Sequence, residues 1–219
     1  AAGDGLVAED AELAPVTPYA VSKVRVESDL DGLTDQDFCT VSLRNATAFG
    51  FSPRLRADIV LNNLVGHALL SGEVLVLSDG TPWRPLVHAA DIADVFAAAL
   101  AAPADEIRGE KINVGSEENN VTVADIAEVV AAETGASVRI TGEAGNDPRS
   151  YRVDFSRLRR LLPGATVRHS ILDGARELAA AYREYGMNDD IFNHRFVRLA
   201  RIRELQEGSQ LDDNLRAVK

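Results

Sequence analysis

Residues 17–27 read TPYAVSKVRVE and place a tyrosine, Tyr19, four positions before a lysine, Lys23. Thr17 is a favourable N-cap and a proline suits the first helical position, so we predict a helix over residues 18–30. Residues at positions i and i+4 of a helix lie on one face, about one turn apart. A phenol and an ammonium group are therefore expected side by side near the start of this helix.

Composition and charge exclude several classes of protein. The chain has 219 residues, 46% of them hydrophobic and 26% charged, as in ordinary globular proteins. Its formal net charge is −11, and nucleic-acid binders are more often basic, so we expect no nucleic-acid partner. The longest apolar runs fall short of the roughly 18 residues of a membrane span, and no signal peptide is recognisable. We expect a cytoplasmic protein that does not bind membranes.

The residues that most often bind metals are few and scattered. Cys39 is the single cysteine, which allows neither an intramolecular disulfide nor a cysteine-based zinc site. The four histidines show no spacing typical of metal ligands. We therefore predict no metal site, and we interpret His88, on a turn between a strand and a helix, as a buried and hydrogen-bonded residue.

Short β-branched or apolar segments alternate with helical patterns along the chain. Strands are predicted at 38–43, 73–78, 84–88, 111–116 and 136–141. Helices are predicted around 62–72, 91–101, 122–135, 156–162 and 171–186. This alternation indicates an α/β protein with parallel βαβ units, in which ligands bind at the carboxyl ends of the strands.

The stretch NNLVGHALLSG at 62–72 is a second candidate for ligand binding. Asn62 or Asn63 is predicted to cap this helix, and Gly72 to end it. The free N–H groups and the dipole of a helix N-terminus suit a phosphate group. We therefore expect an anionic ligand near Asn63.

Three segments in this order resemble the extended short-chain dehydrogenase/reductases, in particular the nucleotide-sugar epimerase/dehydratase family. They are PYAVSK at 18–23, LRNATAFG at 43–50 and DGTPWRPLVHAADIADVFAAAL at 79–100. The resemblance runs from about Gly3 to at least Leu161. A lone Tyr-x-x-x-Lys pair occurs often by chance, whereas three segments at matching spacing are specific.

The resemblance implies a Rossmann-like parallel sheet, present here as its C-terminal part, and a smaller α/β substrate-binding domain. Residues 1–50 would belong to the dinucleotide-binding domain, and 51–187 mainly to the substrate-binding domain. Segments around 81–115 would return to the Rossmann domain, and 188–219 would form a C-terminal helical extension. Neither G-x-G-x-x-G nor G-x-x-G-x-x-G occurs, so we expect the chain to match roughly the last two-thirds of such an enzyme.

The resemblance also implies the chemistry of the first site. A free phenol holds its proton near neutral pH, and a nearby ammonium group favours the phenolate. Tyr19 would be the acid/base that removes a sugar hydroxyl proton while hydride leaves the same carbon for NAD. Lys23 would assist Tyr19 and hold the nicotinamide ribose, and Arg44 would also lie at the cofactor. NADP stays open as an alternative to NAD.

The expected substrate is a nucleotide-diphosphate sugar. A guanidinium group can clamp a diphosphate bidentately, and Arg84 matches a family arginine that does so. Arg149 falls near a third diphosphate position, with Arg152 as its competitor. The other substrate-binding residues expected from the resemblance are Thr47, Asn63, Leu64 and Leu75. The family often has asparagine in place of Thr47 and aspartate in place of Pro85, which leaves the sugar undetermined.

Several functions remain open from the sequence. The leading hypothesis is 4-epimerisation, and a 4,6-dehydratase and a 4-keto reductase are alternatives within the family. A non-catalytic truncated homologue, which binds a nucleotide sugar or a partner chain, is an alternative of another class. A non-sugar alcohol is a third alternative as the substrate. Asn63 and Arg84 argue against it, because a neutral substrate needs no phosphate-binding residues. The resemblance further implies a homodimer that associates through the helix at 18–30.

Overall fold

The computed structural model describes residues 5–143 and 150–218. The fold is mixed α/β, as predicted, and parallel pairing joins β1 to β9, β2 to β6 and β4 to β8. The chain divides into two compact units, each built from separate stretches. The first comprises 1–48, 83–121 and 148–168, and the second comprises 49–82, 122–147 and 169–219.

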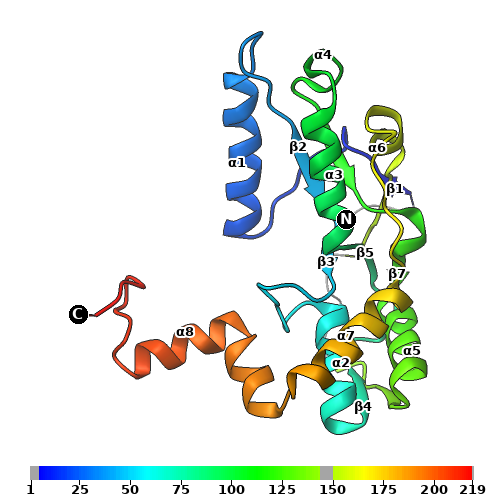
Figure 1. Ribbon diagram of the computed structural model, residues 1–219, viewed down its shortest axis with the longest axis vertical. Coiled ribbons are helices and arrows are strands. Elements are labelled where there is room, and N and C mark those ends of the chain that lie inside the picture. Colours follow the sequence, from blue (N-terminus) through cyan, green and yellow to red (C-terminus); the bar gives the residue numbers. More distant parts are fainter. Residues whose placement is uncertain (1–4, 144–149, 219) are drawn as a thin grey trace. The chain divides into compact units, whose positions relative to one another are not determined.

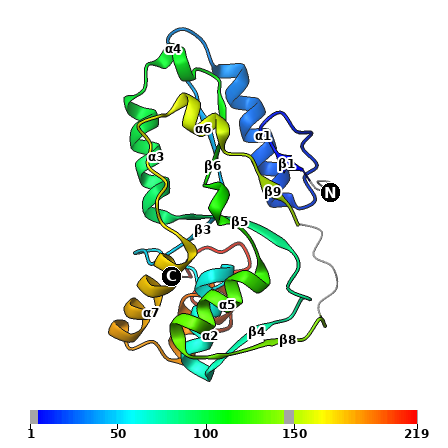
Figure 2. The same ribbon diagram turned by 90° about the vertical axis from the view of Figure 1, so that its right-hand side faces the viewer.

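The parallel pair of β2 (Ser42–Asn45) and β6 (Lys111–Val114) is central to the first unit (Figures 1 and 2). Successive side chains of a strand point to opposite faces. Leu43, Ile112 and Val114 contribute to an apolar core on one face. The opposite face carries polar side chains, namely Ser42, Arg44, Lys111 and Asn113.

The apolar core of the first unit is completed by the helices and strands around this pair. Its buried residues come from β6, β5 (Trp83–His88), α3 (Ala89–Ala101), α4 (Ala104–Ile107) and α6 (Ser156–Leu161), and from the residue that follows α6. They are Val87, Val95, Ile107, Ile112, Val114, Leu158 and Leu162. Two further sheets involve this unit, one of β1 (Leu6–Val7) with β9 (Arg152–Val153), and one of β3 (Thr47–Phe49), β5 and β7 (Asn120–Thr122) in that order. A 3₁₀ turn, η1 (Glu117–Asn119), precedes β7.

Helix α1 (Pro18–Leu33) confirms the predicted helix and extends it by one turn. Thr17 is its N-cap, since its Oγ1 accepts a hydrogen bond from the Ala20 N–H at 3.1 Å, and Pro18 occupies the first position. None of its sixteen residues, all within the described part of the chain, is buried. The apolar residues Val21 and Val24 are only half-buried, so α1 gains little from hydrophobic packing.

The strand predicted at 38–43 begins later than expected. β2 starts at Ser42, and Phe38 is exposed. The partner strand β6 begins only at Lys111, so regular ladder pairing becomes available from Ser42 onward. Before that point, outside the ladder, the Gly109 N–H donates to the Thr40 carbonyl at 2.8 Å.

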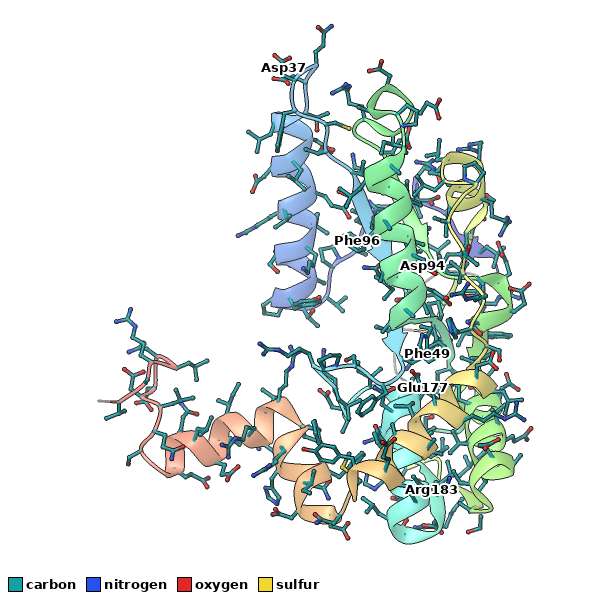
Figure 3. All side chains as sticks on the ribbon, viewed as in Figure 1. Asp37, Phe49, Asp94, Phe96, Glu177 and Arg183 are labelled. Atoms are coloured by element: carbon teal, nitrogen blue, oxygen red, sulfur yellow. The ribbon has the colours of Figure 1, made fainter. Side chains whose placement is uncertain are left out.

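The second unit packs three helices with the parallel pair β4 (Glu73–Val76) and β8 (Ser137–Ile140). The helices are α2 (Val60–Ser71), α5 (Val123–Thr134) and α7 (Ile171–Tyr185). Phe49 and Glu177, labelled in Figure 3, both belong to this unit, and Glu177 accepts a hydrogen bond from the Phe51 N–H at 3.2 Å. Its large fully buried side chains include Leu61, Val65, Val74, Ile126, Leu178, Tyr182 and Phe192.

The helix ends of this unit match the expected capping residues in most cases. Thr122, the first residue of the predicted segment 122–135, caps α5 through a capping box with Asp125, and Gly72 ends α2, as predicted, in the left-handed region with φ of 72°. Ser170 and Asp173 form a second capping box at the start of α7. These local signals are short-range, which explains why they were readable in the sequence.

The C-terminal segment is attached to α2 through an aromatic contact. It contains a π-helical turn, η2 (Ile191–Arg195), followed by α8 (Arg198–Glu207). Phe192 is fully buried and packs edge-to-face with His67 and Tyr182, at ring-centroid distances of 5.3 and 6.1 Å. Burial raises the pKa of the Tyr182 phenol, whose Oη donates to the Asn62 carbonyl at 3.2 Å. In the part of the chain that the structure describes, no helix combines the length and the apolar character needed to cross a membrane.

We predict that Gly66→Ala destabilises the second unit by about 1–3 kcal/mol, because the added methyl group would overlap the ring of Phe192. The ring is fully buried and packs edge-to-face against His67 and Tyr182. Urea unfolding would measure the loss. Gly32→Ala, in α1, meets nothing within 4 Å and is the matched control, with no loss expected. Equal midpoints for the two variants would contradict the packing argument.

We also predict that the capping box of α7 loses its contribution in acid. The side chain and the backbone N–H of Ser170 donate to Asp173 at 2.7 and 2.9 Å, and these bonds lower the pKa of the Asp173 carboxyl. A lowered folded-state pKa means that stability is present above the ordinary aspartate value of about 3.9 and is lost as the pH falls through the folded value. Asp173→Asn should therefore destabilise the protein near pH 7 and differ less from wild type near about pH 2. Urea titrations at the two pH values test this, and a constant difference would contradict it.

Candidate active site

The predicted pair of Tyr19 and Lys23 lies on one face of α1, near its N-terminus. The Lys23 Nζ is 5.4 Å from the centroid of the Tyr19 ring. Tyr19 is 72% exposed, and Lys23 is exposed as well. The two groups are therefore adjacent and accessible, as an acid/base pair that meets an external ligand would need to be.

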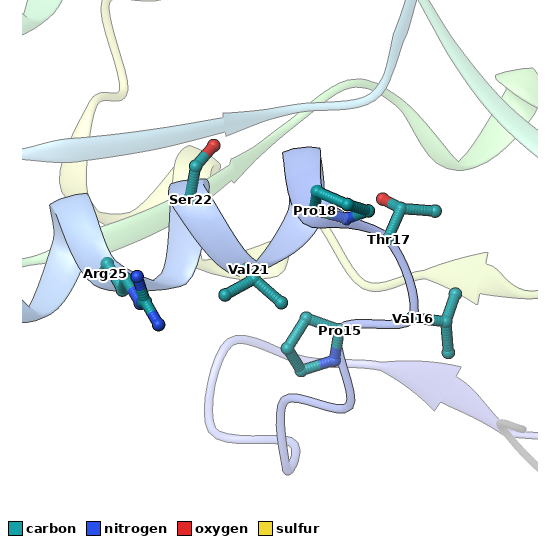
Figure 4. A pocket seen from close by; sticks show the side chains of 7 residues that line it. All are labelled: Pro15, Val16, Thr17, Pro18, Val21, Ser22 and Arg25. Atoms are coloured by element: carbon teal, nitrogen blue, oxygen red, sulfur yellow. The ribbon is translucent and has the colours of Figure 1, made fainter.

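A hollow of about 570 Å³ runs along the first turns of α1, but it does not include this pair (Figure 4). Its lining residues are Pro15, Val16, Thr17, Pro18, Val21, Ser22 and Arg25. Tyr19 and Lys23 are not among them, so the hollow belongs to a different side of the helix. It is open and shallow, and we do not assign it to the candidate site.

A smaller cavity of about 260 Å³ lies at the carboxyl end of β2. Arg44 and Asn45 line it from β2, Ala46 lines it as the residue that follows β2, and Asn113 lines it from β6. Its other lining residues are Val7, Ala8, Ala11, Glu12, Leu13, Pro85, Tyr151 and Val153. The carboxyl ends of parallel strands are where α/β folds bind ligands, so this cavity is the second component of the candidate site.

Arg44, expected at a cofactor, makes contacts within the protein. Its Nε and Nη2 donate to the two carboxylate oxygens of Glu27, at 2.9 and 2.7 Å, and its Nη1 donates to the Glu9 carbonyl at 2.9 Å. The hydrogen bond with Glu27 raises the pKa of Arg44. Arg44 thus joins β2 to α1 and to the segment before α1. A contact with a cofactor stays a prediction.

Glu9 is a buried carboxylate that the sequence reasoning missed. Its Oε1 accepts the Asn113 N–H at 2.9 Å, and its Oε2 lies 3.5 Å from the Arg157 Nε. Its side chain is only 3% exposed, so these partners stabilise a charge that would otherwise be costly to bury. Glu9 therefore fixes the loop that leads into Tyr19. No local pattern distinguishes it from the other acidic residues of that loop.

The expected diphosphate arginines belong to the first unit or lie outside the described residues. Arg84 is on β5, and its Nη1 donates to the Trp83 carbonyl at 2.8 Å. Arg152 is on β9, with its guanidinium 5.0 Å from the centroid of the Trp83 ring. Arg149 lies outside the described residues. Trp83 thus brings Arg84 and Arg152 into one neighbourhood.

The prediction that Asn62 or Asn63 caps α2 is wrong. The helix begins at Val60, and both asparagines lie inside it. The Asn62 side chain is buried and bonds the backbone of the preceding loop at Gly50 and Arg56. Asn63 donates its backbone N–H to the Ile59 carbonyl at 2.8 Å, so this group does not face a phosphate. Because these side chains hold the loop from within the helix, they do not act as caps.

The remaining predicted residues divide between the two units. Thr47 is on β3 in the first unit, together with Tyr19, Lys23 and Arg44. Asn63, Leu64 and Leu75 belong to the second unit, where Leu64 is buried in α2 and Leu75 is half-buried in β4.

Two expectations about histidines and metals can be compared with the structure. His88 is buried, as predicted, and its Nδ1 caps α3 by accepting the Ala90 N–H at 3.2 Å. Within 5–143 and 150–218, no group of three histidine, cysteine, aspartate or glutamate side chains is placed to hold a metal ion.

We predict that Glu9→Gln lowers the free energy of unfolding by about 1–3 kcal/mol, because it removes the charge facing Arg157 at a buried position. Glu12→Gln is the matched control, since Glu12 lies in the same loop and is exposed. Denaturant unfolding of both variants measures the difference. If both variants are equally stable, the buried carboxylate does not hold this loop.

Comparisons with known proteins bear on what this site does. The model of the NAD dependent epimerase/dehydratase family matches residues 2–115, a little over half of the chain. The uncharacterized UDP-glucose epimerase YtcB of Bacillus subtilis (strain 168) is 25% identical over 186 residues, which are 82% of this chain and 57% of that protein.

Solved structures give the same picture. UDP-glucuronic acid 4-epimerase from Bacillus cereus, in complex with UDP-glucuronic acid and NAD, is similar with a TM-score of 0.71 and 25% identity, over 84% of this chain and 58% of that one. UDP-glucose-4-epimerase from Stenotrophomonas maltophila, with bound NAD and formylated UDP-arabinopyranose, gives 0.70 and 26%, over 82% and 59%. Two nucleotide-sugar dehydratases, at 23% and 20% identity, share the fold. The chain spans a little over half the length of these relatives.

Proposed function

Since the chain belongs to the NAD-dependent epimerase/dehydratase family, we propose that it carries the acid/base and substrate-binding parts of an NAD-dependent enzyme that acts on a nucleotide-diphosphate sugar. The reaction is hydride transfer at a sugar carbon, and its outcome is 4-epimerisation. The observation that carries this proposal is the pairing of Tyr19 with Lys23, one turn apart and both open to solvent at the start of α1.

Tyr19 acts on the proton of the reacting hydroxyl group. Its Oη accepts the proton as the sugar C–O bond gains double-bond character, and it returns the proton when the alcohol reforms. The Lys23 ammonium favours the phenolate form of this phenol. NAD, when bound, supplies the acceptor for the hydride. An exposed phenol and ammonium suit such a cofactor, because the ammonium can also donate to ribose hydroxyl groups.

Arginine and asparagine side chains are proposed to recognise the diphosphate. Arg84 is the guanidinium proposed to clamp it, with Arg149 or Arg152 as a second one. Asn63 would bind through its side-chain amide, because its backbone N–H is already used within α2 and the Ala57 carbonyl takes only one of the two amide hydrogens. Thr47, Leu64 and Leu75 are proposed to contact the rest of the nucleotide sugar, and Arg44 the cofactor.

The comparisons favour epimerisation over elimination. The two solved structures at 25% and 26% identity described above are of 4-epimerases, and both contain NAD and a UDP-sugar ligand. The dehydratases are below 25% identity, and their likeness extends only to the fold. Analysis of the products formed from a nucleotide sugar separates the outcomes, since an epimer keeps the mass of the substrate and a dehydration product loses water.

We predict that Tyr19→Phe lowers the rate constant of hydride transfer by about 10²–10⁴-fold, because the phenol proton can no longer be exchanged. Lys23→Met should also slow this step. The measurement is the transient absorbance of reduced nicotinamide in a single turnover, after the purified protein is mixed with NAD and UDP-glucose or UDP-glucuronic acid, because epimerisation would return the hydride to the sugar and leave no net reduced cofactor. Tyr185→Phe is the matched control, because Tyr185 is a partly exposed tyrosine of the second unit and should leave the rate unchanged.

Two results would overturn the proposal. One is a Tyr19→Phe protein that transfers hydride at the wild-type rate. The other is a wild-type protein that binds a UDP-sugar but shows no hydride transfer with added NAD, which would indicate the non-catalytic binding role instead.

A further inference from the structure

We propose that α1 is held on the first unit by charge, and that the ion pairs Glu27–Arg44 and Asp31–Lys111 set the rotation and the register of this helix. Through them, these residues position Tyr19 and Lys23. The catalytic consequence rests on the proposed function, whereas the docking of α1 does not.

The residues of α1 that carry these groups are evenly spaced. Tyr19, Lys23, Glu27 and Asp31 follow one another at intervals of four. Residues at this interval are neighbours on a helix surface and form a slowly winding stripe. The acid/base pair and the anchoring carboxylates therefore share one stripe, so a rotation of the helix would move all of them together.

The spacing of the carboxylates along this stripe matches the spacing of two basic residues on the strands beneath it. Arg44 of β2 holds Glu27, and Lys111 of β6 holds Asp31 at 2.6 and 2.7 Å. Lys111 is in register with Ser42, two residues before Arg44 along the strand direction. Four helical residues rise about 6 Å, and two strand residues span about 6.6 Å. The anchors on the helix and on the sheet therefore have the same spacing, and a slip of one turn would break both pairs.

Apolar packing contributes little to holding α1 in place. None of its residues, all of which are described, is buried. The Glu27 and Arg44 side chains are 19% and 20% exposed and meet through two parallel bonds, the geometry in which an ion pair contributes most. Asp31 is 48% exposed, so the second pair is weaker and mainly fixes the register.

Two further contacts place the ends of the helix. Arg44 Nη1 binds the Glu9 carbonyl, so the same guanidinium also holds the segment that leads into the helix. At the other end, the Thr34 hydroxyl bonds both the Leu30 carbonyl and the Thr40 hydroxyl. The polar face of the β2–β6 pair thus serves as the docking surface for α1.

The docking is tested by hydrogen exchange in the 219-residue chain. Glu27→Gln should speed the exchange of α1 amides by about three- to tenfold and leave α3 unchanged. Asp31→Asn should have a smaller effect. Arg139→Gln is the matched control, because Arg139 meets Glu73 in the second unit through two bonds of 2.9 and 2.8 Å, and its loss should not affect α1.

A double-mutant cycle assigns the effect to the pair. After Glu27→Gln, the further change Arg44→Gln should have a smaller effect than in wild type, because only the bond from Arg44 to the Glu9 carbonyl remains to be lost. In the protein that keeps Glu27, Arg44→Lys should give an intermediate result because it keeps the charge and loses the bidentate geometry. Raising the salt from about 0.01 M to about 1 M should also speed exchange in α1 of the wild type and have less effect on Glu27→Gln. Unchanged α1 exchange in Glu27→Gln, or equal loosening of α1 and α3, would overturn the proposal.

The catalytic consequence needs a readout that stability alone would not change. In a protein preparation that transfers hydride to NAD, as measured by the absorbance of reduced nicotinamide, Glu27→Gln should lower kcat more than it changes KM. Gly66→Ala, which destabilises the other unit, should leave the kcat of the folded fraction unchanged. Equal kcat values in wild type and Glu27→Gln would overturn the positioning role. Absence of the signal in wild type overturns the proposed function, and the exchange experiment then still decides how α1 is docked.

Discussion

The bidentate bond between Arg44 and Glu27 is the interaction on which the candidate site depends. One guanidinium joins the edge of a parallel sheet, the face of a helix and the loop that enters that helix. Arg44 can do this because its planar group carries five donors in a fixed arrangement, which a lysine does not offer. The buried carboxylate of Glu9 extends the same network to β6. Polar contacts, more than apolar burial, therefore give this part of the first unit its geometry.

The sequence predicted well what depends on short-range chemistry. Local capping rules predicted the start of α1 at Thr17 and Pro18, the start of α5 near Thr122 and the end of α2 at Gly72. The structure confirms these helix ends. The alternation of strands and helices likewise predicted a parallel α/β fold. The family followed from three separated segments, and the match over residues 2–115 bears it out.

The predictions failed where the contacts of a residue lie in a distant part of the chain. β2 starts late because its partner strand starts late, which no local pattern reveals. Asn62 looked like a cap, but its amide binds backbone groups six and twelve residues away. The partners of Arg44 within the protein, Glu27 and Glu9, are also distant in the sequence and were not predicted, while its contact with a cofactor stays a prediction. The four-residue spacing after Lys23 was a signal that could have identified Glu27, whereas Glu9 required the structure.

The division of the chain into two units has a consequence for handling the protein. Each unit is assembled from three separate stretches, so the polypeptide passes repeatedly from one to the other. Neither unit can therefore be isolated as a continuous gene segment, and a single proteolytic cut cannot separate them. An exchange of one unit between homologues would need several splice points at once. The properties of such a chain are accordingly easier to vary by point substitutions than by recombination.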